Sequence, residues 1–251
     1  MLESYGVCDV GLVRQTNQDF ILTDEELGLF LVADGMGGHS HGEVASRLAA
    51  ETVQSYVATS RDRFDVSWPF GYDFDLSVDG NRLNTAVRLA NRQVWRRADQ
   101  DPKSAGMGTT VAALLATGME VVVGNIGDSR IYRYRGGTLE QLSEDDTWIR
   151  GMLSRGLISE DEARTHPMRN VLVQAAGSQE EVTVHIRQVD ALPGDLFLIS
   201  SDGLHGVVGD SRMCAVLASF GTLEQAASRL AQAAREQGAP DNVSVVLVRF
   251  G

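Results

Sequence analysis

Cysteines are scarce in this sequence, and no apolar run is long enough to cross a membrane. Cys8 and Cys214 lie far apart and outside any C-x-x-C spacing, which favours reduced thiols over a structural disulfide. The longest apolar runs, at residues 111–117 and 243–248, are far shorter than the about 20 residues of a membrane helix. The first residues also lack the basic and apolar segments of a signal peptide. These absences predict a cytoplasmic protein.

Lysine is almost absent, and acidic residues outnumber basic ones. Lys103 is the only lysine among 22 basic residues, and 34 acidic residues give a net charge of −12 at pH 7. Such a chain repels polyanions, and no local basic patch offsets the repulsion. We therefore expect no nucleic-acid partner and no membrane partner. Arg92, Arg96 and Arg97 are interpreted as the solvated outer face of a helix.

In other respects the composition is that of an ordinary globular protein. The 251 residues are 43% hydrophobic and 22% charged, enough for a sizeable core in one large domain or two small ones. Internal repeats and low-complexity tracts are not visible. Residues 61–79, rich in aspartate and aromatic residues, are interpreted as a surface loop between two helices.

Hydrophobic periodicity predicts helices and strands in separate runs. Helical spacing covers residues 43–59, 81–99, 211–219 and 222–236, with shorter helical turns near 148–155 and 160–164. Strands are predicted at residues 5–11, 19–23, 29–33, 109–116, 121–126, 129–135, 139–142, 182–189, 196–200 and 243–250.

Tight connections between successive strands indicate how these elements are arranged. The Gly136-Gly137 pair is typical of a hairpin turn, and hairpins imply antiparallel pairing rather than βαβ units. Two stacked sheets with helices outside would bury all the apolar faces. We predict an α+β fold, a four-layer α-β-β-α sandwich of two mainly antiparallel sheets flanked by helix pairs.

Four aspartates follow apolar runs or stand before one, and three of them adjoin glycine. Asp34, Asp128 and Asp202 come after apolar strands, and Asp241 precedes the last one. Clustered buried carboxylates are costly unless cations compensate them, and hard divalent ions such as Mg²⁺ or Mn²⁺ prefer oxygen ligands. Two such ions would balance four carboxylates. Gly35 would let a backbone carbonyl approach an ion closely.

Each signal alone has a simpler interpretation. A single aspartate at a strand end is usually a turn former or a helix cap. The glycines at 35, 37 and 38 would also suit a sharp turn, and they lack the Gly-Lys-Ser/Thr of a P-loop. The joint occurrence of the four aspartates is what favours a metal centre.

The sequence resembles the bacterial form of the PP2C-type (PPM) metal-dependent Ser/Thr protein phosphatases. The resemblance runs from about Gly6 to Val248, and its motifs occur in the family's order. They are Arg14-Gln15-Thr16-Asn17-Gln18-Asp19, Asp34-Gly35-Met36-Gly37-Gly38-His39 with Gly42-Glu43-Val44-Ala45-Ser46, Gly108-Thr109-Thr110, Gly127-Asp128-Ser129-Arg130, Ser201-Asp202-Gly203 and Asp241-Asn242. The resemblance implies a single PP2C-like catalytic domain over residues 1–251, with a flap at about 145–180.

The resemblance also implies a set of metal ligands. Asp34 would bridge two Mn²⁺ or Mg²⁺ ions, and the carbonyl of Gly35 would bind the second. Asp202 and Asp241 would hold the first ion. Asp128, together with Asp202, would bind a third, weaker ion.

Two further residues have implied roles at the same site. Asp19 would act through metal-bound water, and Arg14 would bind the substrate phosphate, since a planar guanidinium suits two phosphate oxygens. The catalytic set is then Arg14, Asp34 and Asp202. A water shared by the two ions would attack phosphorus in line with the departing Ser or Thr oxygen.

Some positions depart from the family's pattern. Met36 stands where eukaryotic relatives have a proposed histidine acid, and His39, three residues later, is as well suited to anchoring the loop as to catalysis. Asp146 stands where the family usually has a histidine, and residues 170–175 also differ from the commoner form. These changes bracket the flap and bear on substrate preference. His166, His185 and His205 are interpreted as surface residues.

We therefore predict a monomeric protein Ser/Thr phosphatase that acts on phosphorylated proteins and reverses a bacterial Ser/Thr kinase. Two alternatives remain: a catalytically silent phosphoprotein-binding module, and a small-molecule phosphoester hydrolase on the same fold.

Overall fold

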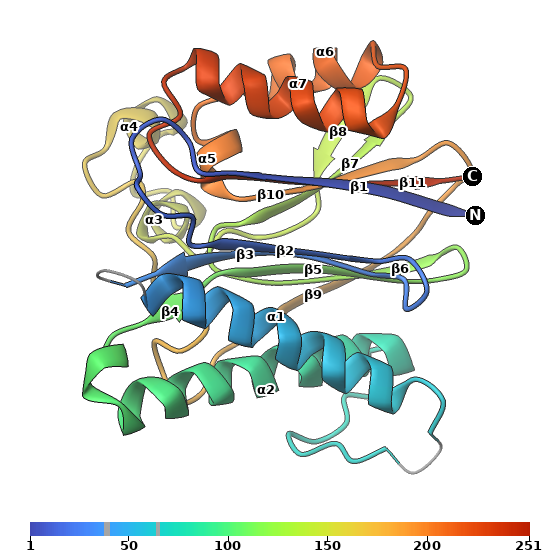
Figure 1. The fold of residues 1–251 in the computed structure, drawn as a ribbon, viewed down its shortest axis with the longest axis vertical. Helices are drawn as coiled ribbons and strands as arrows, with labels where there is room; N and C mark the ends of the chain where they lie inside the picture. The colour runs from blue at the N-terminus through green and yellow to red at the C-terminus, as the bar shows by residue number, and fades with distance from the viewer. Residues whose placement is uncertain (38–40, 64–65) are drawn as a thin grey trace.

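Two antiparallel sheets lie face to face at the centre of the molecule (Figure 1). The computed structural model describes residues 1–37, 41–63 and 66–251. The first sheet has the order β1 (Leu2–Asp9), β11 (Val243–Phe250), β10 (Leu196–Ser200), β7 (Arg130–Arg135) and β8 (Thr138–Gln141). The second has the order β2 (Asp19–Asp24), β3 (Leu29–Met36), β5 (Val111–Thr117), β6 (Glu120–Ile126) and β9 (His185–Asp190), and β4 (Gly108–Thr109) also pairs with β3.

Helices cover the outer face of each sheet. The helices α1 (His41–Ser60) and α2 (Val78–Gln100) pack on the second sheet, and α6 (Asp210–Ala218) and α7 (Leu223–Glu236) lie over the first (Figure 1). Side-chain caps begin two of these helices. The Ser77 side chain accepts a hydrogen bond from the N–H of Gly80 in α2, and the Thr222 side chain accepts one from the N–H of Gln225 in α7. The predicted four-layer sandwich is confirmed.

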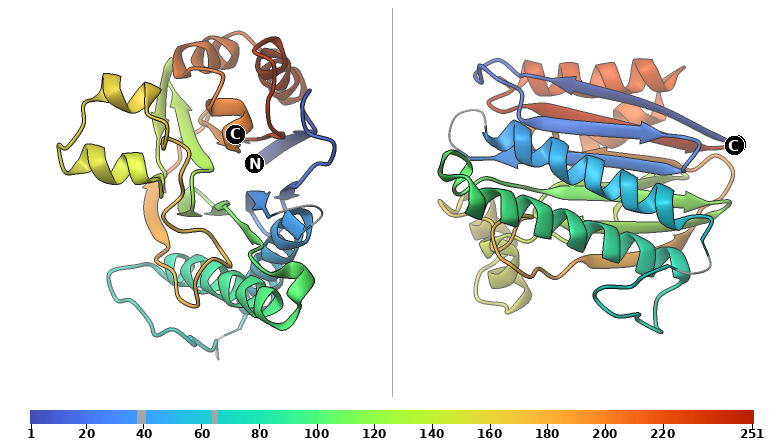
Figure 2. Two further views of the ribbon diagram at one scale, coloured as in Figure 1. Left: turned by 90° about the vertical axis from the view of Figure 1, so that its left-hand side faces the viewer. Right: turned by 60° about the horizontal axis from the view of Figure 1, so that its bottom comes forward.

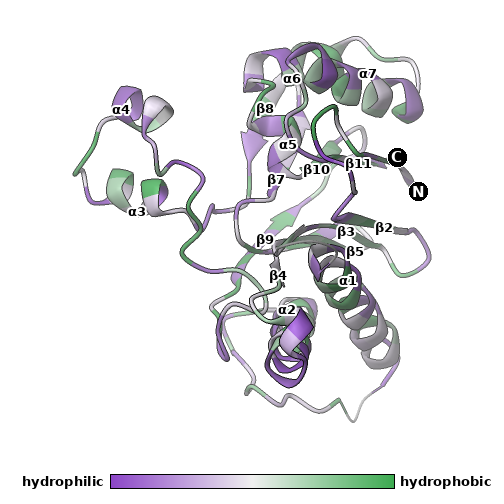
Figure 3. Ribbon diagram, turned by 60° about the vertical axis from the view of Figure 1, so that its left-hand side comes forward, coloured by the Kyte–Doolittle hydropathy of each residue, from purple (hydrophilic) through white to green (hydrophobic). Residues whose placement is uncertain are grey.

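The core has three layers that match this arrangement. Between the sheets lie Phe30, Leu114, Ile199 and Val246 with their neighbours, and residues next to them in each strand point to the helices instead. Leu29 and Leu31, for example, pack under α1 and α2. Strands that are buried on both faces explain the continuous apolar runs of the sequence. Figure 3 shows the hydrophilic outer side of α2 beside these hydrophobic strands.

Two short helices project from one edge of the sandwich. They are α3 (Trp148–Ser154) and α4 (Glu160–Thr165), seen in yellow in the left view of Figure 2. A capping box between Ser159 and Glu162 begins α4. The predicted helical turns at 148–155 and 160–164 are confirmed, and this α3–α4 segment lies within the predicted flap.

Several details differ from the expectations. The predicted strand at 182–189 begins at His185, because the Gln174 amide takes both the N–H and the carbonyl of Thr183. The run 109–116 is divided at Thr110, whose side chain accepts from the N–H of Asp34. The short helices Pro102–Ser104 and α5 (Asp202–His205) were not predicted.

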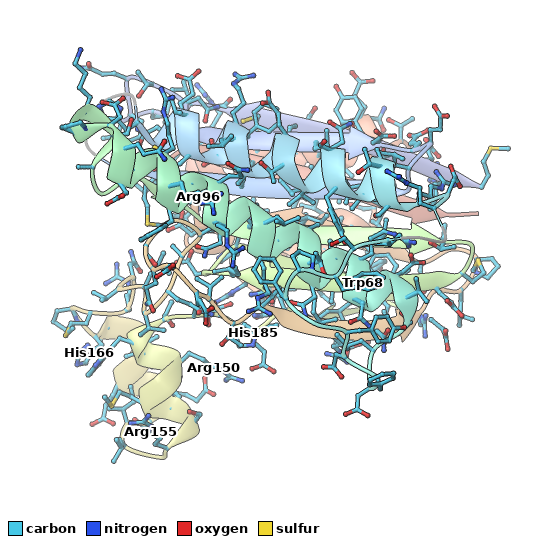
Figure 4. The ribbon with its side chains drawn as sticks, turned by 90° about the horizontal axis from the view of Figure 1, so that it is seen from below. Trp68, Arg96, Arg150, Arg155, His166 and His185 are labelled. Atoms are coloured by element: carbon cyan, nitrogen blue, oxygen red, sulfur yellow. The ribbon has the colours of Figure 1, made fainter. Side chains whose placement is uncertain are left out.

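Aromatic contacts stabilise the stretch before α2 that contains Trp68, Phe70 and Tyr72. Trp68 and Tyr72 meet edge to face at 5.3 Å, and the guanidinium of Arg92 lies 4.5 Å above the ring of Phe70. Arg92 is therefore engaged by an aromatic ring, whereas Arg96 extends from the outer face of α2 (Figure 4). No helix in the described part of the chain is long and apolar enough to span a membrane.

Candidate metal centre

Strand register brings two of the predicted acids together. In the β2–β3 pair, Asp19 lies directly opposite Asp34. Asp34 follows the fully buried residues 29–33, so its carboxylate stands where the apolar part of β3 ends. Asp19 is itself only 7% exposed, and its Oδ2 accepts a 2.8 Å hydrogen bond from Ser201 Oγ. Ser201 directly precedes Asp202, so this bond joins the two sheets at the acids.

The other sheet supplies two more acids from neighbouring strands. Asp202 begins α5 just after β10, and Asp241 stands two residues before β11, which pairs with β10. Gly203 permits the close approach, because a Cβ there would lie 1.8 Å from the carbonyl oxygen of Asn242. The negative charges of Asp19, Asp202, Asp128 and Asp241 all act on Asp34. Acidic residues from four other segments therefore converge on Asp34.

Burial and mutual repulsion make four of these carboxyls weaker acids than usual. Burial, and then the charges of its acidic neighbours, raises the pKa of Asp34 well above its usual value. Burial likewise raises the pKa of Asp19 to about 6 and that of Asp128 to about 7, with the charge of Asp202 adding to both. The pKa of Asp202 is raised by burial and by the charge of Asp241. Such a cluster is stabilised by positive charge.

The free oxygens in the cluster fit a hard cation. Asp19 Oδ1 and Asp202 Oδ1 are buried without a hydrogen-bond partner among the described residues. Unpartnered carboxylate oxygens in an all-oxygen donor set suit Mg²⁺ or Mn²⁺. No group of three His, Cys, Asp or Glu residues in the described part of the chain already forms a ligand set, so ion binding requires side-chain adjustment.

Gly35 lies in a tight backbone contact. Its N–H donates to the carbonyl of Gln18 at 3.1 Å, and an added Cβ would lie 2.0 Å from the carbonyl oxygen of Gly42. Gly42 is equally constrained, since its own Cβ would lie 2.7 Å from the Gly35 oxygen. Packing of β3 against the start of α1 therefore requires both glycines even without an ion.

Asp128 stands on a turn that is tied to Asp34 through two hydroxyls. Gly127 has φ +90°, a conformation that favours glycine. Ser129 Oγ lies 2.6 Å from Thr110 Oγ1, which in turn accepts from the N–H of Asp34 at 3.0 Å. The predicted third-ion residue is thus held at a defined place beside the cluster.

Arg14 reaches the same cluster from an exposed loop. Its Nε and Nη2 donate to the two carboxylate oxygens of Asp241, at 2.9 and 2.7 Å. Hydrogen bonding to Asp241 and the nearby charges of Asp34 and Asp202 raise the pKa of Arg14. The structure therefore brings Arg14 together with Asp19, Asp34, Gly35, Asp128, Asp202 and Asp241.

Some positioning residues were not singled out in the sequence. The Asn242 side chain accepts from the N–H of Gln18 and donates to the carbonyls of Val10 and Thr16, which shapes the loop that carries Arg14. Its only signal was its place in the Asp241-Asn242 motif. His185 and His205 were interpreted as surface residues, but both are half-buried. His185 contacts Asp146, and His205 contacts Ser200. His39 lies outside the described residues.

Comparison with known proteins finds similar sequences over nearly the whole chain. The family model described as "Protein phosphatase 2C" matches residues 12–247. Serine/threonine protein phosphatase PstP of Mycobacterium tuberculosis is 37% identical over 240 residues, which are 95% of this chain and 43% of PstP. This chain therefore spans less than half the length of that relative. Serine/threonine phosphatase stp of Listeria welshimeri is 32% identical over 96% of this chain and 92% of its own.

A solved structure has the same fold. The catalytic domain of PstP in complex with two manganese ions superimposes with a TM-score of 0.83 at 33% identity, covering 99% of this chain and 97% of that one.

Proposed function

Because this chain belongs to the protein phosphatase 2C family, we propose that it hydrolyses phosphoserine and phosphothreonine in proteins with the help of Mn²⁺ or Mg²⁺. One observation carries the proposal. Carboxylates from both sheets converge on Asp34, and two of their oxygens have no partner among the described residues. Burial and repulsion raise the pKa values of Asp19, Asp34, Asp128 and Asp202. That arrangement suits cation binding better than it suits the stability of the metal-free fold.

In this proposal, Asp34 and Gly35, with Asp202 and Asp241, hold two ions. Asp128 with Asp202 holds a third, weaker ion, and Asp19 acts through a water. When bound, such ions lower the pKa of water and neutralise charge on phosphoryl oxygens. The manganese in the related PstP structure supports the choice of ion.

The chain's own residues orient the substrate. Arg14 presents a planar guanidinium with Nε and Nη2 side by side, already paired with two carboxylate oxygens of Asp241. We propose that two phosphoryl oxygens take the place of that carboxylate, because the spacing of donors suits either group. The exposed side of Arg14 leaves room for a protein substrate.

The partners would be phosphorylated proteins and the kinase that modifies them. The names of the relatives support phosphoprotein substrates. We also propose a cytoplasmic location, since Cys8 and Cys214 are both free, as in a reducing compartment.

An assay with a phosphothreonine peptide and p-nitrophenyl phosphate tests the function. We expect turnover of both with Mn²⁺ and none with a chelator. Turnover that a chelator leaves unchanged would contradict the metal-dependent mechanism. If p-nitrophenyl phosphate is hydrolysed but the phosphothreonine peptide is not, the small-molecule hydrolase is favoured. If neither substrate is hydrolysed, a silent binding module is favoured.

Replacement of Arg14 by alanine is expected to lower kcat/KM for the phosphopeptide by roughly 10- to 100-fold. Each hydrogen bond to a charged group contributes about 1.5–3 kcal/mol, and about 1.4 kcal/mol is tenfold. R14K keeps the charge but loses the paired donors, so intermediate activity is expected. Steady-state kinetics at saturating Mn²⁺ measures the effect, and R14A kinetics equal to wild type would refute the assigned role.

A further inference from the structure

Asp146 is a buried carboxylate that the proposed function does not use. It is 7% exposed, and its Oδ2 accepts hydrogen bonds from the N–H of Gly127 and from Gln174 Nε2, both at 2.9 Å. His185 Nε2 lies 2.8 Å from its Oδ1 (His185 is labelled in Figure 4, on the side that faces the projecting helices). A buried carboxylate is tolerated when it is bonded in this way. Each of its oxygens therefore has a defined partner.

The backbone of Asp146 strengthens the same connection. Its N–H donates to the carbonyl of Gly127 at 2.9 Å, and its own carbonyl accepts from the N–H of Val173 at 2.8 Å. The next residue, Thr147, caps α3 and forms a bridge with Leu172. Both ends of the α3–α4 segment are thus joined to the turn at Gly127.

That turn leads directly to the metal centre. Asp128 follows Gly127. A larger residue would not fit at position 127, because an added Cβ would lie 2.7 Å from Thr110 Cγ2. Thr110 is the residue whose hydroxyl accepts from the N–H of Asp34. Hydrogen bonds link Asp34 to Thr110 and Thr110 to Ser129, and the backbone of the turn leads from there to Gly127, whose N–H donates to Asp146.

We propose that Asp146 is a positioning residue, which fixes Asp128 through Gly127 and holds the α3–α4 segment beside it. This inference rests on the proposed function, in which Asp128 binds the weaker ion. Without the carboxylate, the N–H of Gly127 loses its acceptor and the turn gains freedom. Partners that orient a metal ligand typically change metal affinity by 10- to 100-fold.

The test compares D146A with D195A. Asp195 is 2% exposed and bonded to Arg135, but it stands at the opposite end of β10 from Asp202. Calorimetric titration of Mn²⁺ into the metal-free protein, without substrate, measures the Kd of each ion. The Kd of the weakest-bound ion should be about 10-fold or more higher in D146A than in the wild type. The Mn²⁺ concentration for half-maximal turnover should rise in parallel. D195A should lower Tm while binding Mn²⁺ as the wild type does.

Asparagine at 146 serves as the conservative variant. Its amide oxygen can still accept from Gly127 and Gln174, and its NH₂ can donate to a neutral His185 ring, so D146N should restore most of the Mn²⁺ affinity. If D146A does not fold, Q174A tests the same oxygen at a half-buried position, with a severalfold rise in half-saturating Mn²⁺ expected. An Mn²⁺ response equal to wild type in folded D146A, or in Q174A where D146A does not fold, would overturn the positioning role.

These outcomes separate the two proposals. Wild-type protein that binds Mn²⁺ but lacks Mn²⁺-dependent turnover would overturn the proposed function, while the calorimetry would still judge Asp146. If the wild-type protein shows Mn²⁺-dependent turnover and D146A binds Mn²⁺ as tightly as D195A does, only the positioning role is overturned.

Discussion

Replacement of Asp34 by asparagine is expected to lower Mn²⁺-dependent phosphatase activity by about a thousandfold. Charge stabilisation by a bound cation is worth several kcal/mol, and each 1.36 kcal/mol is tenfold in rate. The same change should raise the Tm of the metal-free protein, because it removes a buried carboxyl surrounded by four acidic neighbours. Steady-state kinetics and thermal unfolding of D34N measure the two effects.

Asp24 provides a matched control for that variant. It lies at the opposite end of β2, where it accepts hydrogen bonds from the N–H of Leu27 and from Gln54 Nε2. D24N should therefore retain wild-type activity and show no gain in metal-free Tm. D34N activity within tenfold of wild type would refute the role of Asp34.

Mn²⁺ is expected to raise Tm much more at pH 7.5 than at pH 5.5. The pKa values of about 6 for Asp19 and about 7 for Asp128 lie above about 3.9, the value in an unfolded chain. The metal-free folded state thus binds extra protons, so its free energy of unfolding falls as pH rises from about 4 to about 7. Cations bind the ionised carboxylates, so Mn²⁺ competes with protons at the lower pH.

The size of this effect follows from linkage. Mn²⁺ at 100 times its Kd contributes about 2.7 kcal/mol, which corresponds to a Tm shift of about 5–10 °C for a domain of this size. Thermal unfolding at both pH values, with Mn²⁺ or a chelator, measures it, and D34N should lose most of the shift. A Tm gain that does not depend on pH would contradict binding at these carboxyls.

Much of the fold could be read from the pattern of apolar residues. Period-two and continuous apolar runs identified the strands, and helical spacing identified α1, α2, α6 and α7, because burial imposes those periods. Asp34, Asp128, Asp202 and Asp241 stood out because four aspartates occur together at the borders of apolar strands, and clustered buried carboxylates need compensating charge. The pattern failed where a side chain replaced a backbone partner, as Gln174 does at the start of β9.

Local sequence determined which elements form and which acids stand at their ends. Only the tertiary structure decided that β2–β3 register places Asp19 opposite Asp34, and that sheet stacking brings Asp202 and Asp241 to the same end. The role of Asp146 could be recognised only in the tertiary structure, because its partners at 127, 174 and 185 come from three distant segments. Periodicity records whether a side chain is buried, whereas its partner depends on register and layer packing, which arise from contacts between segments remote in the chain.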